Sequence, residues 1–76
     1  MDEGIRAVPV RAGGIRLGQL LKLAGVAGSG ADAKSVLQGG AVTVNGAPET
    51  RRGRQLADGD LVAVGDDVVR VVVEGR

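Results

Sequence analysis

The 76-residue sequence contains no phenylalanine, tyrosine or tryptophan, and it also lacks cysteine and histidine. Without aromatic rings it cannot bind nucleic acid by stacking bases on an aromatic platform, so any stacking falls to arginine. Without cysteine and histidine it has no disulfide, no thiolate zinc site and no histidine general base. These absences predict a protein that is not an enzyme and that holds neither a cofactor nor a metal ion.

Long apolar runs are also missing, since no stretch approaches the roughly 18 apolar residues that a membrane-spanning helix needs. The acidic start, Met1 to Gly4, is not followed by the apolar segment of a signal peptide. We therefore expect a cytoplasmic protein with no membrane partner and no small-molecule substrate. The length predicts one domain spanning residues 1–76, because so short a chain leaves no room for a second core.

The net charge of +1 hides an uneven distribution along the chain. Residues 11–54 hold seven bases and two acids, whereas the rest of the chain holds three bases and seven acids. If the basic middle segment forms one face, that face can bind a polyanion even though the whole chain is almost neutral. The alternative, that these charges scatter over a small surface by chance, stays open from this pattern alone.

Helical periodicity begins at residue 17. The apolar positions recur at i, i+3, i+4 and i+7, which is typical of an amphipathic helix: Leu17, Leu20, Leu21 and Ala24. Gly25 is placed to end this helix. Arg16 and Lys22 fall on the opposite side, and Leu23 falls there too, so the face away from the core is not purely polar.

A second short helix is predicted after Ser29, whose hydroxyl can cap the helix while Asp32 lies in its first turn. Its apolar stripe is formed by Ala33, Val36 and Leu37. Its exposed face carries Lys34 and Gln38. The pair Gly39-Gly40 ends this helix, and the two helices together form a helical hairpin.

The remaining segments have strand composition. Residues 5–10 form a candidate strand, and Pro9 restricts it to the edge of a sheet or must lie at the end of the strand. Residues 42–44 alternate apolar and polar, and Asn45-Gly46 is typical of a type I′ hairpin turn, so residues 49–56 are expected as the returning arm. Acidic turns at 58–60 and 65–67 separate strands at 61–64 and 68–73, and we interpret these acids as turn formers, not metal ligands. The order of elements predicts an α+β domain.

The last predicted strand, Val68 to Val73, is apolar at every position except Arg70. Such a strand is either covered on both faces of a sheet or lies at an exposed edge that pairs with a second copy. We expect a monomer and leave weak self-association open.

Several motifs occur in a fixed order along the chain: Arg16-Leu17, Leu20-Leu21, residues 29–33, residues 37–46 and residues 56–60. The most specific are Gly-x-Val-x-Val-Asn-Gly at 40–46 and Leu-x-x-Gly-Asp at 56–60. On these motifs the chain resembles the S4 RNA-binding domain, or alpha-L RNA-binding motif, over roughly residues 15–64. It is most similar to small stand-alone bacterial members, which carry an Arg-Arg-Gly-Arg segment. The resemblance implies a short helical hairpin packed on a small curved, mostly antiparallel β-sheet.

The resemblance also implies a non-enzymatic protein that binds structured RNA, such as ribosomal or transfer RNA, through basic side chains that contact phosphates. It points to Arg16, Lys34 and Asn45 from the family pattern, to Arg51, Arg52 and Arg54 from the stand-alone members, and to Lys22 by position. The chain departs from the family at Gly18, where an Asp is usual, and at Gly30, where an Arg is usual.

Other interpretations stay open at this point. Asn45 and Gly46 can be turn formers only, Lys22 an ordinary exposed helix residue, and the arginine cluster a solvated surface turn. A β-grasp-like carrier or protein-interaction module is the alternative function, because Val-Asn-Gly, Leu-x-x-Gly-Asp and a valine-rich last strand also occur in sulfur-carrier proteins. Those proteins end in Gly-Gly, whereas this sequence ends in Glu74-Gly75-Arg76.

Overall fold

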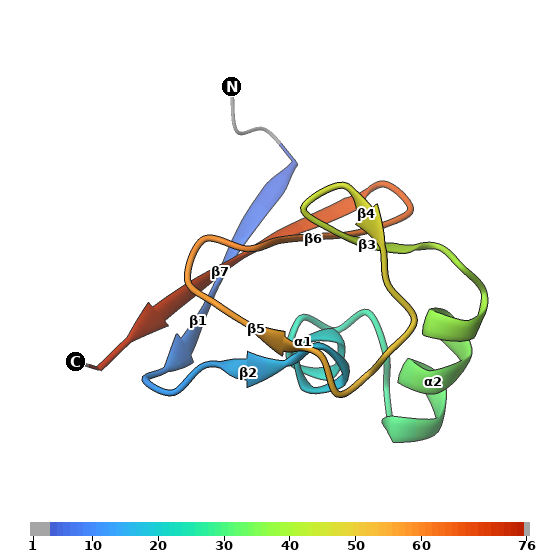
Figure 1. The fold of residues 1–76 in the computed structure, drawn as a ribbon, viewed down its shortest axis with the longest axis horizontal. Helices are drawn as coiled ribbons and strands as arrows, with labels where there is room; N and C mark the ends of the chain where they lie inside the picture. Colours follow the sequence, from blue (N-terminus) through green and yellow to red (C-terminus); the bar gives the residue numbers. More distant parts are fainter. Residues whose placement is uncertain (1–3, 76) are drawn as a thin grey trace.

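The computed structural model describes residues 4–75, and Figure 1 shows its helices and strands. In chain order these are β1 (Ile5–Arg11), β2 (Ile15–Arg16), α1 (Leu17–Leu23), α2 (Gly30–Gln38), β3 (Val42–Val44), β4 (Ala47–Pro48), β5 (Gln55–Leu56), β6 (Leu61–Val64) and β7 (Asp67–Glu74). The expected α+β class with a helical hairpin is confirmed.

Five strands form the main sheet in the order β1-β7-β6-β3-β4, while β2 and β5 pair separately. All neighbours run antiparallel except β1 and β7, which are parallel. Within the described residues β1 is an edge strand, and Pro9 lies exposed on it opposite Val72. Because proline has no N–H to donate to a ladder, the sequence left an edge or a strand end open, and the structure shows the edge.

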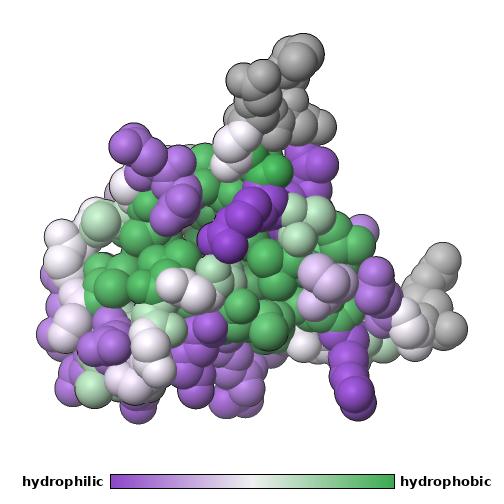
Figure 2. All heavy atoms as spheres, turned by 180° about the vertical axis from the view of Figure 1, so that it is seen from behind, coloured by the Kyte–Doolittle hydropathy of each residue, from purple (hydrophilic) through white to green (hydrophobic). Residues whose placement is uncertain are grey.

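The core lies between the two helices and one face of the main sheet. The helices contribute the leucines, and the strands contribute valines at alternate positions: Leu17, Leu20, Leu21, Leu37, Val42, Val44, Val62 and Val71 are the largest fully buried side chains. Each contributes about 1.5–3 kcal/mol by leaving water. Figure 2 shows that hydrophobic side chains also reach the surface across the middle of the side opposite to Figure 1.

Both helices end as the sequence indicates. After α1, Gly25 adopts a φ of +78°, and the N–H of Val26 donates to the carbonyl of Leu21, which completes a Schellman motif. At the start of α2, the Ser29 hydroxyl accepts a hydrogen bond from the Asp32 N–H at 3.2 Å. Neither helix of the described chain is long or apolar enough to cross a membrane.

The returning arm of the predicted hairpin is different in the structure. The Asn45-Gly46 turn forms with positive φ at both residues. However, β4 ends at Pro48, so the prediction of a strand through residues 49–56 was wrong. Glu49 makes one more backbone bond to Val42, and the chain then leaves the sheet as a loop until β5 pairs with β2. We call residues 49–54 the arginine loop.

The position of β7 also settles one of the two interpretations of the valine-rich segment. It lies between β1 and β6, so the interpretation of this segment as an exposed edge strand that could pair with a second copy was wrong. Val69 and Val71 point into the core, while Val68 and Val72 are half-buried on the other face. The apolar composition therefore reflects a central strand of the sheet.

Candidate nucleic-acid interface

The arginine loop is organised around one buried carboxylate. The Glu49 side chain is only 9% exposed, and its oxygens accept hydrogen bonds from the backbone N–H groups of Thr50 and Arg51. The same carboxylate pairs with Arg51 at 3.2 Å and with Arg54 at 3.0 Å. Glu49 therefore bends the chain away from the sheet and holds two of the three arginines of the loop.

These contacts shift the charge equilibrium of Glu49. Hydrogen bonds from the Arg51 side chain, the Arg51 backbone and the Arg54 side chain lower the pKa of Glu49 to about 2. The same carboxylate raises the pKa of Arg51 above its ordinary value. Glu49 is therefore ionised at neutral pH, and this acid offsets part of the positive charge of the loop.

The other side of the loop is fixed to the start of α1. The N–H of Leu17 donates to the carbonyl of Arg54 at 2.8 Å, and the N–H of Gly18 donates to the carbonyl of Arg52 at 2.9 Å. These amides are among the four at a helix start that have no partner within the helix. The loop thus caps α1 through these two amides, which are therefore not available to an anion.

Gly18 makes this close approach possible. A Cβ atom at this position would lie 3.1 Å from the Arg52 Cβ and 3.4 Å from the Arg52 carbonyl oxygen, which is tighter than an ordinary van der Waals contact. The departure from the usual family Asp is therefore accompanied by a tightly packed loop. The sequence suggested only the loss of a helix-start charge, because the approach of a loop 34 positions away is a tertiary contact.

Basic side chains from three elements gather around Arg52. One hollow, of about 220 Å³, lies between α1, α2 and the loop and is lined by Arg16, Gly18, Gln19, Lys22, Ala33, Arg52 and Gly53. A second, of about 190 Å³, is lined by Lys34, Leu37, Gln38, Thr50 and Arg52. Arg52 borders both hollows and so connects the cations of α1 with Lys34 of α2. We call Arg16, Lys22, Lys34 and Arg52 the basic face.

Asn45 lies apart from this face and is held by internal hydrogen bonds. Its Nδ2 donates to Asp60 Oδ1 at 3.0 Å, and its Oδ1 accepts from the Leu61 N–H at 2.9 Å. Its backbone N–H donates to the Leu61 carbonyl at 2.7 Å, and its φ is +53°. Every polar group of the Asn45 side chain thus joins the β3–β4 turn to the start of β6.

The seven predicted site residues therefore fall into three groups. Arg16, Lys22, Lys34 and Arg52 form the basic face, Arg51 and Arg54 border it while paired with Glu49, and Asn45 belongs to a separate turn. Sequence reasoning missed Glu49, although an acid two residues before an arginine cluster is a visible signal for an ion pair. It also missed Gln19, which accepts a hydrogen bond from the Arg16 N–H and lines the first hollow.

No cluster of three or more metal-ligating side chains occurs among residues 4–75. What the arrangement offers is a set of neighbouring cations beside surface hollows, on a small module made of a helical hairpin and a mostly antiparallel sheet. Such cations suit phosphate groups, because guanidinium forks and ammonium groups bind their oxygens directly.

Comparison with known proteins identifies the family to which this module belongs. Residues 8–72 match the S4 domain family, and the chain belongs to it. The chain is 52% identical over 50 residues to the probable ribosome maturation protein RlbA of Bacillus subtilis, an alignment that covers 66% of this chain and 70% of that protein.

A solved structure agrees with this assignment. The chain is similar to the solution structure of YbcJ from Escherichia coli, with a TM-score of 0.65, 35% identity and coverage of 91% of this chain and 86% of YbcJ. YbcJ is described as having an αL motif involved in RNA binding. The resemblance drawn from residues 15–64 is therefore confirmed, and RNA binding is favoured over the β-grasp carrier alternative.

Proposed function

We propose that this protein binds structured RNA, with ribosomal RNA as the first candidate, through phosphate contacts made by the basic face. One observation carries the proposal: Arg52 borders both hollows and brings the cations of the two helices together. The similarity to a probable ribosome maturation protein supports ribosomal RNA over transfer RNA. The rigid mounting of the loop on α1 supports recognition of a fixed RNA shape.

The same proposal includes a non-enzymatic role in the cytoplasm, as a single RNA-binding module that acts as a monomer. Cationic side chains position an RNA and carry out no bond-making step. Arg51, Arg54 and Asn45 take secondary places in this proposal, since their polar atoms already have partners inside the protein.

Salt dependence tests the proposal directly. Binding of labelled ribosomal RNA fragments, measured by fluorescence anisotropy, is expected to weaken with salt at a log-log slope of roughly −3 if about four cations meet phosphates. The variant with Arg16, Lys22, Lys34 and Arg52 all replaced by Ala should lose most of that slope. An unchanged slope in this variant would move the binding site elsewhere on the molecule.

A matched pair of adjacent residues sharpens the test. Arg52→Ala should lower RNA affinity by about tenfold, while Arg51→Ala should lower it less, since Arg51 is already neutralised in part by Glu49. Circular dichroism checks that both variants fold. Equal losses for the two variants would contradict the proposed importance of Arg52.

The lack of tyrosine and tryptophan supplies a simple further measurement. The protein itself absorbs almost nothing at 280 nm, so an absorbance peak at 260 nm that follows it through purification reports bound nucleic acid. This peak should disappear after a wash at high salt.

A further inference from the structure

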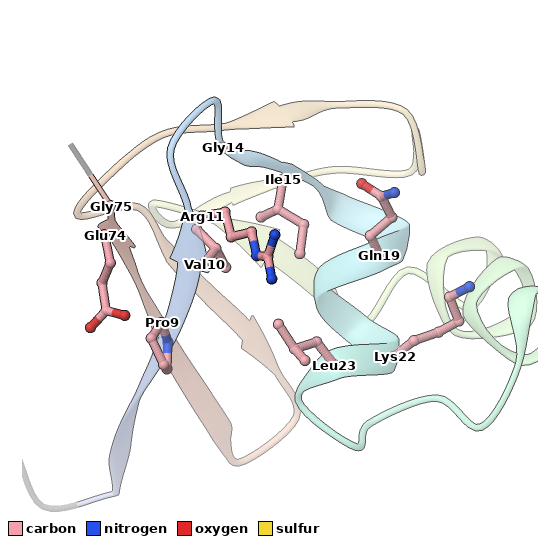
Figure 3. A pocket seen from close by; sticks show the side chains of 10 residues that line it. All are labelled: Pro9, Val10, Arg11, Gly14, Ile15, Gln19, Lys22, Leu23, Glu74 and Gly75. Carbon is pink, nitrogen blue, oxygen red and sulfur yellow. The ribbon is translucent and has the colours of Figure 1, made fainter.

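A larger hollow lies beside the basic face, between β1 and α1. It measures about 770 Å³, and Figure 3 shows the side chains that line it. Arg11, Ile15 and Leu23 extend into the space between the strand and the helix. Glu74 also lines the hollow, from β7, where it is the register partner of Arg11. The hollow therefore has apolar walls, a guanidinium group and one carboxylate at its rim.

Leu23 gives this hollow an unusual wall. Its side chain is 57% exposed, although a leucine normally gains about 1.5–3 kcal/mol from burial. Among residues 4–75, Leu23 is the large hydrophobic residue that is exposed to solvent, and it lies on the side of α1 away from the core leucines. A ligand with an apolar surface that covers Leu23 would recover this free energy.

Arg11 supplies a flat polar group next to that wall. A guanidinium plane can stack on a nucleobase, which matters in a chain without any aromatic ring. A nucleobase has two apolar faces and a polar edge, so it fits between an aliphatic wall and a guanidinium plane. A base can offer these faces only when it is unstacked from its own helix.

The hollow adjoins the basic face through two shared lining residues. Gln19 and Lys22 line both this hollow and the smaller one that contains Arg16 and Arg52. Figure 3 shows Lys22 extending from α1 toward α2, which places it at the border between the two. An RNA strand whose phosphates lie on the basic face can therefore direct a neighbouring base toward Leu23.

We propose that the hollow between β1 and α1 binds an unstacked nucleobase of the RNA, held between Leu23 and Arg11. This inference rests on the proposed RNA binding and adds that the preferred RNA has an unpaired nucleotide next to a helix. A protein segment on the same apolar wall is the competing occupant. Arg11 and Lys22 outnumber the one acid of the lining, Glu74, and the hollow shares Gln19 and Lys22 with the basic hollow, so the observations favour RNA.

Two short RNA stem-loops test the inference, one with a single bulged 2-aminopurine and one with the same stem fully paired. The wild-type protein should bind the bulged RNA about tenfold more tightly, in line with the usual contribution of one stacked base. The 2-aminopurine fluorescence should change on binding, and the protein contributes no aromatic signal to that measurement.

Variants separate the hollow from the basic face. Leu23→Ser and Arg11→Gln should reduce the preference for the bulged RNA to less than about threefold while binding to the paired stem stays unchanged. Arg52→Ala is the matched control and should weaken binding of both RNAs equally, so the preference survives. Leu23 is exposed, so its replacement leaves the core intact.

The outcomes of this experiment are distinguishable. Equal wild-type affinity for the two RNAs, or a preference that survives Leu23→Ser, would overturn the nucleobase site and leave the proposed RNA binding standing. Failure to bind either RNA at low salt would overturn both. A preference lost in both hollow variants and kept in Arg52→Ala would support the site.

Discussion

The arginine loop and the Asn45 turn lie in neighbouring parts of one motif but use their polar side chains differently. Both side-chain groups of Asn45 bind within the protein, to Asp60 and to the Leu61 N–H. Arg52, in contrast, borders two hollows without any hydrogen bond or ion pair of its side chain among residues 4–75. A polar residue of a binding motif can therefore act structurally in one turn and remain available to a ligand in the next.

Glu49 places the other two arginines between these extremes. Arg51 and Arg54 give one or more donors to the carboxylate, yet the Arg51 side chain is still 75% exposed. The loop thus combines two features. The ion pairs of Glu49 with Arg51 and Arg54 set its shape, and Arg52 lies outside this cluster and points outward. The following variants test how separate the two regions are.

The largest expected effect is at Glu49. Glu49→Gln removes the charge that accepts five hydrogen bonds from Thr50, Arg51 and Arg54, and should lower the stability of the loop and of the α1 start that it caps. Because the folded pKa of about 2 is below the ordinary 4.5, this stabilisation is present above about pH 4.5. It is lost as the pH falls toward 2.

Urea unfolding followed by circular dichroism checks this dependence. The stability difference between wild type and Glu49→Gln should be large at neutral pH and shrink as the pH falls from about 4.5 to about 2. Asp66→Asn, at an exposed acid in the β6–β7 turn, is the matched control and should change stability little. A difference that does not vary with pH would contradict the assigned role of the carboxylate.

Asn45→Ala tests whether the second region is purely structural. The change removes two side-chain hydrogen bonds and puts alanine at a φ of +53°, so the free energy of unfolding should fall by about 2 kcal/mol. Asn45→Gly keeps the backbone permissive and should cost about half as much. Affinity of the folded protein for RNA should be unchanged, and a large loss would make Asn45 an RNA contact after all.

The smallest effect is expected where the arginine loop touches α1. Gly18→Ala gains up to about 1 kcal/mol of helix propensity but forces the Arg52 backbone to move by a few tenths of an ångström. The free energy of unfolding should therefore change by less than about 1 kcal/mol, and RNA affinity by about twofold.

Gly14→Ala is the contrasting control for this prediction. Its φ is +82°, and an added Cβ would lie 2.8 Å from the Leu56 carbonyl oxygen, so this change should destabilise by about 2 kcal/mol or more. Thermal and urea unfolding measure both. Equal destabilisation at Gly14 and Gly18 would show that the loop cannot shift.

The sequence predicted local features better than tertiary ones. Both helices, the Ser29 cap, the Gly25 and Gly40 ends and the Asn45-Gly46 turn follow from periodicity and backbone preference, which act over a few residues. The arginine loop was mistaken for a strand because Glu49 and the start of α1 hold it through contacts with no local signature. Parallel pairing of β1 with β7 was not predicted for the same reason.

The candidate site shows a similar division. That Arg16, Lys22, Lys34 and Arg52 are basic is visible in the sequence, but their gathering around two hollows depends on how the helical hairpin meets the loop. The hollow beside Leu23 had one sequence signal, a leucine on the polar side of the first helix. Its other walls come from β1, whose place in the sheet only the fold reveals.

The pairing of β1 with β7 has a consequence for how the protein is made. Ile5 pairs with Val68 and Arg11 with Glu74, so β1 finds its neighbour only after residues 67–74 have left the ribosome. Loop closure over such a distance is slow, because its entropic cost precedes the contacts that reward it. During synthesis, β1 must therefore wait as an unpaired segment, and we expect cooperative folding to begin only when β7 is complete.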